Sequence, residues 1–159
     1  MSSRRLAREK VMQSLYALEV GGGDIRHYLD TFIRPELADD ENNVKFAERL
    51  LIRTLDIVDD ADDIIHRHTQ NWDISRIALV DHILLRMAIC ELTAFEDIPP
   101  KVTLNESIEI AKLYSTPRSG QFINGVLDAV IAELRQEGRL RKSGRGLVGM
   151  DELHDRPDK

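Results

Sequence analysis

The start of the chain brings together side chains that can bind nucleic acid. Arginine guanidinium groups pair with phosphates or stack on bases, and a tyrosine ring offers a stacking face to an unpaired base. The stretch RRLAREKVMQSLYALE begins at residue 4 and contains Arg4, Arg5, Arg8, Lys10 and Tyr16. Its arginines occupy the first two turns of a predicted helix, where the positive end of the helix dipole disfavours cations. This placement indicates an anionic partner, and a phosphate chain fits that chemistry.

Helical geometry predicts that part of this set shares one side of the helix. At about 100° per residue, the apolar positions from Ala7 to Leu18 form one face, and Arg5, Arg8 and Tyr16 fall on the flank beside it. Two guanidinium groups and an aromatic ring on one flank suit single-stranded RNA. A solubilising helix surface, with Tyr16 at the edge of the core, is the competing interpretation. Composition alone does not decide between the two.

The charge distribution also favours a local anion-binding surface. The 159-residue chain carries 22 Lys and Arg against 28 Asp and Glu, for a net charge of −6. Residues 1–10 hold four cations and one carboxylate, a net +3, which leaves −9 on the remainder. The chain as a whole would repel a polyanion at long range, and the asymmetry indicates one local anion-binding surface. The sequence leaves open whether the basic stretch GRLRKSGRG near the C-terminus adds RNA affinity.

Other chemistry finds little support. His66 and His68 stand two residues apart, so on a helix they point in roughly opposite directions, and no third metal ligand is near them. The aspartates between residues 56 and 63 lack the spacing of a calcium loop and are interpreted as a solvated face. Cys90 lies in an apolar run without a basic neighbourhood. No nucleotide-binding loop occurs. We therefore expect no enzyme, no metal site and no cofactor.

Apolar spacing predicts an all-α protein of six or seven helices. The expected helices cover residues 2–20, Asp24 to the residue before Pro35, 43–69, 76–95, Thr103 to the residue before Pro117, and Ser119 to Gly138. A T-x-x-E capping box is predicted to open the helix at Thr103, and Ser119 is predicted to cap the last helix. We expect one domain over residues 1–137 and a disordered tail over 138–159, since the tail has few apolar residues. Without a signal peptide or an apolar span, and with a single cysteine, the sequence predicts a soluble cytoplasmic protein.

Two blocks of the sequence resemble a known family. RRLAREKVMQSLYALE near the start and IPPKVTLNESIEIAKLYSTPRSGQFINGVLDAV near the end are similar to the NusB family of bacterial transcription antitermination factors. LVDHILLRMAICEL, between them, resembles that family's central helix. The resemblance runs in order from Arg4 to about Leu134. It implies a compact all-α fold of two small helical bundles. It also implies binding to the boxA element of ribosomal RNA leader transcripts together with NusE, a ribosomal small-subunit protein, in an RNA polymerase antitermination complex.

The resemblance also implies site residues. The RNA-binding positions that it assigns are Arg4, Arg5, Arg8, Gln13, Tyr16, Lys101, Gln121 and Phe122. Phe122 has an equal claim to be a core residue, because an aromatic at helical spacing serves either role. Asp81 matches a position implicated in NusE docking. Two departures from the family pattern are Leu6, where a third basic residue is common, and Arg118, where an acidic residue is common. Asn124 and Gly125 are interpreted as permitting close helix packing.

Two functions from different classes remain. The first is a non-enzymatic RNA-binding adaptor, in which arginines attract phosphates and aromatics hold unstacked bases. The second is a protein-interaction scaffold whose basic first helix docks an acidic protein surface. A helix-turn-helix DNA-binding protein is disfavoured because no interior helix has the basic character of a recognition helix. The sequence leaves open whether the chain forms a homodimer that would cover the basic helix.

Overall fold

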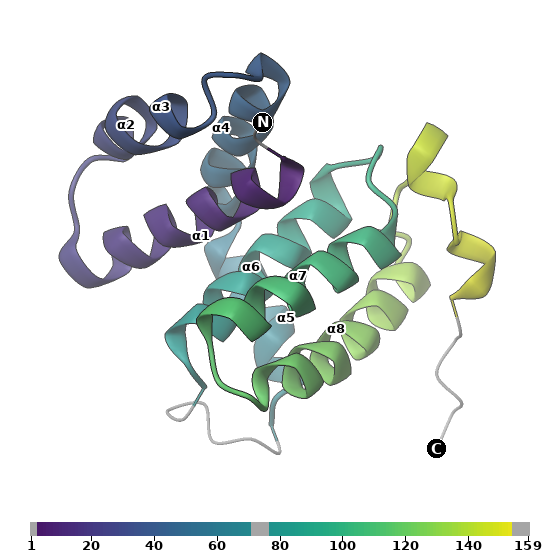
Figure 1. Ribbon diagram of the computed structural model, residues 1–159. Coiled ribbons are helices and arrows are strands. Elements are labelled where there is room, and N and C mark those ends of the chain that lie inside the picture. Colours follow the sequence, from purple (N-terminus) through teal and green to yellow (C-terminus); the bar gives the residue numbers. More distant parts are fainter. Residues whose placement is uncertain (1–2, 71–76, 154–159) are drawn as a thin grey trace. The chain divides into compact units, whose positions relative to one another are not determined.

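The computed structural model describes residues 3–70 and 77–153, which form helices and connecting turns and contain no strand. The all-α expectation is therefore confirmed for this part of the chain. The chain divides into two compact units, Met1–Asp56 and Ile57–Lys159. Figure 1 shows the helices of each unit. No helix among the described residues has both the length and the apolar character needed to cross a membrane.

Unit 1 is built on helix α1, Arg4–Gly21. The helix begins as expected at a serine, because the Ser3 hydroxyl accepts a hydrogen bond from the Leu6 N–H at 3.0 Å. It ends before Gly22, whose φ of 69° lies in the positive range that glycine adopts without strain. Ala7, Val11 and Leu15 are buried along its inner face.

The rest of unit 1 packs against this inner face. Helix α4, Glu41–Asp56, makes the main contact with α1. A continuous helical stretch precedes it, composed of α2 (Ile25–Tyr28), the π-helical turn η1 (Leu29–Ile33) and α3 (Arg34–Glu36). It runs past Pro35, where the sequence predicts a stop. The π turn ends at Ile33, two residues before this proline, which has no N–H to donate to the preceding turn.

The long helix predicted over residues 43–69 is wrong. The structure divides this segment into α4 and a second helix, α5, Val58–Arg67. Ile57, at the junction, leaves helical geometry with φ −109° and ψ 15°. Apolar spacing continues on both sides of the junction, so periodicity alone could not show a break at which the chain passes from one unit to the other.

Unit 2 is organised around helix α6, Leu79–Ala94. It contacts α5, α7 (Pro100–Tyr114) and α8 (Ser119–Gln136), so nearly its whole circumference is buried. This accounts for its apolar residues on every side. α7 begins at Pro100, not at Thr103, so the predicted capping box is wrong. Thr103 is buried instead, and its hydroxyl donates to a carboxylate oxygen of the buried Glu91 at 3.2 Å.

Helix α8 differs from expectation at two points. Ser119 does not cap it; its hydroxyl accepts from the Thr116 N–H at 3.1 Å in the preceding turn. Gly125 is exposed, and a Cβ added there would meet nothing within 4 Å, so it does not permit close packing. The predicted end at Gly138 is confirmed by its φ of 70° and by a hydrogen bond from the Arg139 N–H to the Leu134 carbonyl at 2.9 Å.

Residues 139–153, here called the C-terminal strap, are ordered against unit 2, where the sequence predicts disorder. The strap contains two short 3₁₀ turns, η3 (Gly144–Leu147) and η4 (Met150–Glu152). Leu140 is buried, and the Lys142 ammonium donates to the carbonyls of Glu91 at 3.1 Å and Phe95 at 2.8 Å, at the end of α6. Composition misses this docking because backbone and lysine contacts, more than apolar side chains, hold the strap. Residues 154–159 of the predicted tail lie outside the described part.

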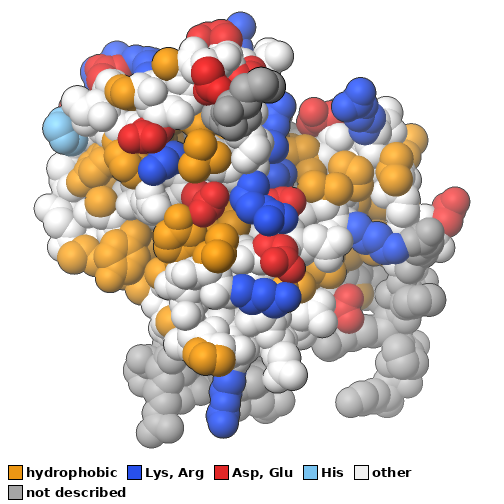
Figure 2. All heavy atoms as spheres, viewed as in Figure 1, with side chains coloured by type: hydrophobic (Ala, Val, Ile, Leu, Met, Phe, Trp, Pro, Cys, Tyr) orange, Lys and Arg blue, Asp and Glu red, His pale blue; other side chains and the backbone are white. Residues whose placement is uncertain are grey.

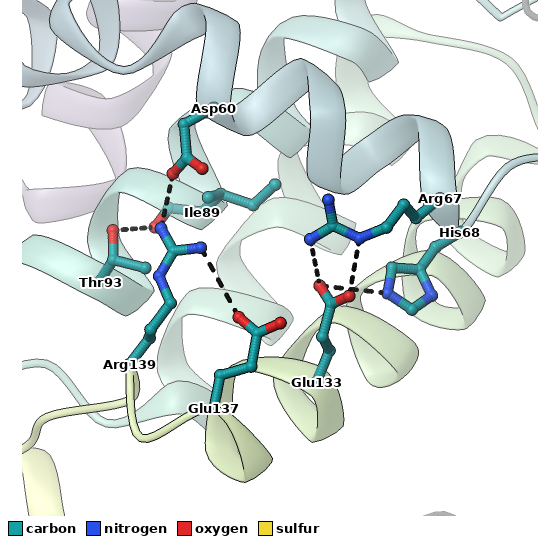
Figure 3. A network of polar contacts seen from close by, with 8 residues as sticks. All are labelled: Asp60, Arg67, His68, Ile89, Thr93, Glu133, Glu137 and Arg139. Atoms are coloured by element: carbon teal, nitrogen blue, oxygen red, sulfur yellow. Dashed lines mark hydrogen bonds and ion pairs between the residues drawn. The ribbon is translucent and has the colours of Figure 1, made fainter.

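Ion pairs connect the second unit's helices and strap (Figure 3). Arg67 on α5 makes two hydrogen bonds to the Glu133 carboxylate on α8, at 2.8 and 3.0 Å, and Arg139 in the strap reaches Asp60 on α5 at 2.5 Å. The Arg67 guanidinium holds the pKa of Glu133 below its usual value. This contribution to stability is therefore present at neutral pH and lost as the pH falls through the lowered pKa.

Ion pairs also involve part of the aspartate-rich face of α5. Asp62 accepts from the Arg86 guanidinium through both carboxylate oxygens at 2.8 Å, and His82 lies 2.8 Å from one of them. Burial alone would raise the pKa of Asp62, but the hydrogen bonds from Arg86 and His82 lower it further than burial raises it. The predicted solvated face is thus partly engaged in ion pairs inside unit 2.

Candidate nucleic-acid interface

The arginines of α1 are organised by an aromatic ring on α4. The Arg4 guanidinium carbon lies 4.3 Å from the centroid of the Phe46 ring, and that of Arg8 lies 5.1 Å from the same centroid. Both distances are within the range of cation–π attraction. Helix spacing explains the pair, because Arg4 and Arg8 are one turn apart and face the same partner helix. In Figure 2, Lys and Arg side chains gather near the first turn of α1.

The predicted flank of α1 is only partly at the surface. Arg8 is 4% exposed, because its guanidinium is covered where α1 meets α4. Arg4 is exposed and Arg5 half-buried. Tyr16 is 42% exposed, which fits a stacking surface better than a core position.

Two further polar groups line α1. Lys10 places its ammonium 4.7 Å from the Phe32 ring centroid and 3.4 Å from the Gln13 amide oxygen. Gln13 is half-buried, so part of its amide can reach solvent. α1 thus carries cationic groups that lie over aromatic rings of the same unit, with the Gln13 amide beside one of them.

In unit 2, the start of α8 presents Gln121 and Phe122, and Arg118 directly precedes the helix. Arg118 and Gln121 are exposed, while Phe122 is half-buried, between its two predicted roles. Asp81 on α6 holds this first turn of the helix in place. It is 5% exposed, and its carboxylate accepts a hydrogen bond from the Ser119 hydroxyl at 2.7 Å. Asp81 is therefore not on the surface where a direct partner contact would need it. Its second carboxylate oxygen is buried with no hydrogen-bond partner among the described residues.

Lys101 lies apart from that turn. It is the second residue of α7 and is exposed, whereas Gln121 follows the end of α7. With a rise of about 1.5 Å per residue, the length of α7 separates the two by roughly 20 Å. α7 and α8 form an antiparallel pair in Figure 1, with these residues at opposite ends of it. The structure therefore does not gather the predicted unit 2 residues into one cluster.

The described residues do not support a catalytic or metal-binding site. Within residues 3–70 and 77–153, no group of three or more His, Cys, Asp or Glu side chains could hold a metal ion. Cys90 is buried, as its apolar run predicts. His68 lies 3.4 Å from a Glu133 carboxylate oxygen in an ion-pair arrangement rather than beside His66.

Phe46 is the residue of this interface that sequence reasoning missed. It is 7% exposed and lies four residues before Leu50, on the apolar spacing of α4. Its spacing is that of any core aromatic, so only the fold shows that two arginines of another helix share its ring.

The comparisons with known proteins agree with this architecture. A family model described as the NusB family matches residues 5–132. The transcription antitermination protein NusB of Salinibacter ruber is 53% identical over 156 residues, covering 98% of both chains. A NusB structure from T. maritima has a TM-score of 0.75 at 34% identity, covering 83% of this chain and 92% of that one.

A further solved structure shares the fold at lower identity. The crystal structure of antitermination factors NusB and NusE in complex with dsRNA matches with a TM-score of 0.72 and 22% identity, covering 82% of this chain and 96% of that one. The relatives' names denote a transcription factor and not an enzyme, in agreement with the sequence-based expectation. Family model, full-length relative and fold together show that the chain belongs to the NusB family.

Proposed function

We propose that the protein is an antitermination factor that binds boxA-type single-stranded RNA of ribosomal RNA transcripts together with NusE. In this role it joins an RNA polymerase complex in the cytoplasm and reduces termination. Family membership supports the general role. The observation that carries the RNA assignment is the arginine pair of α1 held on the Phe46 ring, next to Arg5 and followed by the exposed Tyr16.

The geometry of α1 suits recognition of a flexible strand. A guanidinium held over a ring has already lost part of its side-chain freedom, so less entropy is lost when it meets a phosphate. Arg4 and Arg5 supply the phosphate contacts, and Tyr16 and Gln13 contact bases by stacking and by hydrogen bonding. The buried Arg8 acts as a positioning residue, since it shares the Phe46 ring with Arg4.

Unit 2 adds contacts through Gln121, Phe122 and Lys101. Arg118 is exposed beside the first two, where the family pattern is often acidic, and should extend the cationic surface. Asp81 contributes to the same surface indirectly, because it holds the turn that leads into α8.

Binding should depend strongly on the partner. The net charge of −6 opposes association with RNA, and a few phosphate contacts give a weak, salt-sensitive complex. NusE, as a second RNA-binding subunit, would add contacts and raise the affinity. A homodimer that covers α1 would compete with RNA for the same residues.

The test is RNA affinity of Arg4→Ala with Arg5→Ala, measured with and without NusE on a boxA-type RNA and on a scrambled strand. The matched control is Arg53→Ala, an exposed arginine in the last turn of α4 in the same unit. We expect the double variant to lose about tenfold or more in affinity and to show a shallower salt dependence, by about 0.7 in slope per lost phosphate contact. The control should bind like the wild type.

Unchanged affinity and salt slope in the double variant would refute the RNA role of α1. If the same variant instead loses an acidic protein partner while RNA binding stays at the wild-type level, the scaffold function replaces the proposed one.

A further inference from the structure

We propose that the C-terminal strap places Arg141 and Arg145 beside Lys101 as a second phosphate-binding surface for the same RNA. The inference rests on the proposed RNA-binding function and adds residues beyond the two blocks that resemble the family. The surface, here called the strap surface, consists of Lys101, Arg141 and Arg145, all exposed.

The strap is held in one place by contacts to the turn between α6 and α7. The Ser143 N–H donates to the Glu96 carbonyl at 3.0 Å, and the Lys142 ammonium donates to two carbonyls at the end of α6. Gly146 lies so close that a Cβ added to it would be 1.8 Å from the Glu96 carbonyl oxygen. At the far end, the Arg135 guanidinium donates to the Leu153 carbonyl at 2.7 Å. Arg141 and Arg145 are thus carried on fixed backbone and not on a free tail.

The strap also reaches Lys101 directly. A Cβ on Gly149 would lie 3.4 Å from the Cδ atom of Lys101, so the glycine backbone passes along the stem of this lysine. This places residues just after Arg145 against one of the proposed RNA-contacting residues. The strap therefore passes the same end of unit 2 as Lys101, roughly 20 Å from Gln121 by the length of α7.

Some cations of unit 2 are held in ion pairs inside the unit, whereas two arginines of the strap are exposed. Several cations of unit 2 are held by acceptors inside the unit: Arg67 by Glu133, Arg86 by Asp62, Lys112 by Glu109 and Arg139 by Asp60. Arg141 and Arg145 have no ion-pair partner among the side chains that the structure describes.

Nearby carboxylates weaken the positive charge of these two arginines only in part. Glu96 and Asp97 are exposed in the turn under the strap and would repel a phosphate chain. The Lys142 ammonium interacts electrostatically with both and with the buried Glu91, so it offsets part of the local negative charge. Arg141 and Arg145, on either side of Lys142 in sequence, are left to act toward solvent.

The experiment measures affinity of the full chain with NusE for a short boxA-type RNA and for a longer RNA with added flanking nucleotides. The test variant is Arg141→Ala with Arg145→Ala. The matched control, Arg26→Ala with Arg53→Ala, removes the same charge from two exposed arginines of unit 1 that lie outside both proposed surfaces. We expect the test variant to bind the longer RNA about three- to tenfold more weakly, with a salt slope smaller by about 0.7 per lost contact, and the control to bind like the wild type.

Two further variants separate charge from position. Arg141→Lys with Arg145→Lys keeps both charges and should bind nearly as the wild type does. Gly146→Ala keeps every charge but displaces the strap, and should weaken binding of the longer RNA as the alanine pair does.

Equal affinity and salt slope for wild type and the Arg141, Arg145 alanine variant on the longer RNA would overturn this inference. If α1 variants still weaken binding in that experiment, the proposed function stands while the strap surface is refuted. A wild-type protein that binds neither RNA, alone or with NusE, overturns both.

Discussion

At the scale of single residues, Phe46 decides what the arginines of α1 can do. Two cations one turn apart repel each other, and a shared aromatic ring offsets part of that repulsion while it orders both side chains. Arg8 is covered as a consequence, and Arg4 is left at the surface. The number of arginines in the sequence therefore overstates the number of direct phosphate contacts that this helix can make.

Asp81 is the second residue whose role follows from burial. We predict that Asp81→Ala lowers the free energy of unfolding by about 1–3 kcal/mol, because the Ser119 hydroxyl loses its charged acceptor in a buried site. Urea unfolding at constant m value measures this change. RNA affinity should fall as well, since the turn that leads to Gln121 and Phe122 loosens.

Asp128→Ala is the control for this prediction. Asp128 is exposed on α8, so its removal should change stability by no more than about 0.5 kcal/mol. An Asp81→Ala protein with wild-type stability and RNA affinity, but weakened binding to NusE, would contradict the positioning role and favour a direct partner contact.

At the scale of elements, two glycines in and after α8 should respond in opposite ways to substitution by alanine. We predict that Gly146→Ala destabilises unit 2 by about 1–3 kcal/mol, because the new methyl group overlaps the Glu96 carbonyl and forces the strap to move. Gly125→Ala, in open space within α8, should stabilise the protein by up to about 1 kcal/mol, since alanine has the higher helix propensity.

Limited trypsin digestion reports the same difference by a second route. Cleavage after Arg141 and Arg145 should be faster in Gly146→Ala than in the wild type, and unchanged or slower in Gly125→Ala. Equal cleavage of all three proteins would show that the strap does not depend on close approach at Gly146.

The elements also show where sequence reasoning succeeds. Ser3, Gly22 and Gly138 mark helix ends through local hydrogen bonds or backbone geometry, and such signals are readable from neighbours in the chain. Thr103 has the spacing of a helix cap but is drawn into a hydrogen bond with Glu91, twelve residues away. Local patterns thus predict where helices occur, while contacts between helices decide what individual polar residues do.

At the scale of the whole molecule, the same distinction separates what the sequence could and could not predict. The arginine-rich start and the resemblance indicate the family and the all-α fold. The break at Ile57, the covering of Arg8 and the docked strap depend on residues distant in the chain. Neither apolar spacing nor composition predicts any of these three features.

Because of Lys142, the stability of unit 2 should change with pH in the alkaline range. Burial lowers the pKa of Lys142 from 10.5 to about 8, and the carboxylates of Glu91, Asp97 and Glu96 limit that fall. Between these two values the unfolded chain binds more protons than the folded one, so the contribution of Lys142 to stability rises as the pH increases from about 8 to 10.5.

Urea midpoints of the wild type and Lys142→Met across that range test the prediction. The stability of the wild type minus that of Lys142→Met should increase with pH, and comparison with Lys112→Met corrects for the loss of an exposed lysine. A difference that is constant or narrows with rising pH would contradict the burial of Lys142.

The contact between Lys142 and the end of α6 has a consequence for how the protein is made. During synthesis the ribosome releases residues 91–95 well before residue 142, so the carbonyls of Glu91 and Phe95 have only their local backbone hydrogen bonds until Lys142 emerges. Unit 1, whose sequence ends at Asp56, is complete far earlier and can fold while unit 2 is still being translated. A nascent chain stalled before residue 142 would therefore carry the arginine-rich helix in its final form. Its second unit would still lack the hydrogen bonds from Lys142 to the end of α6.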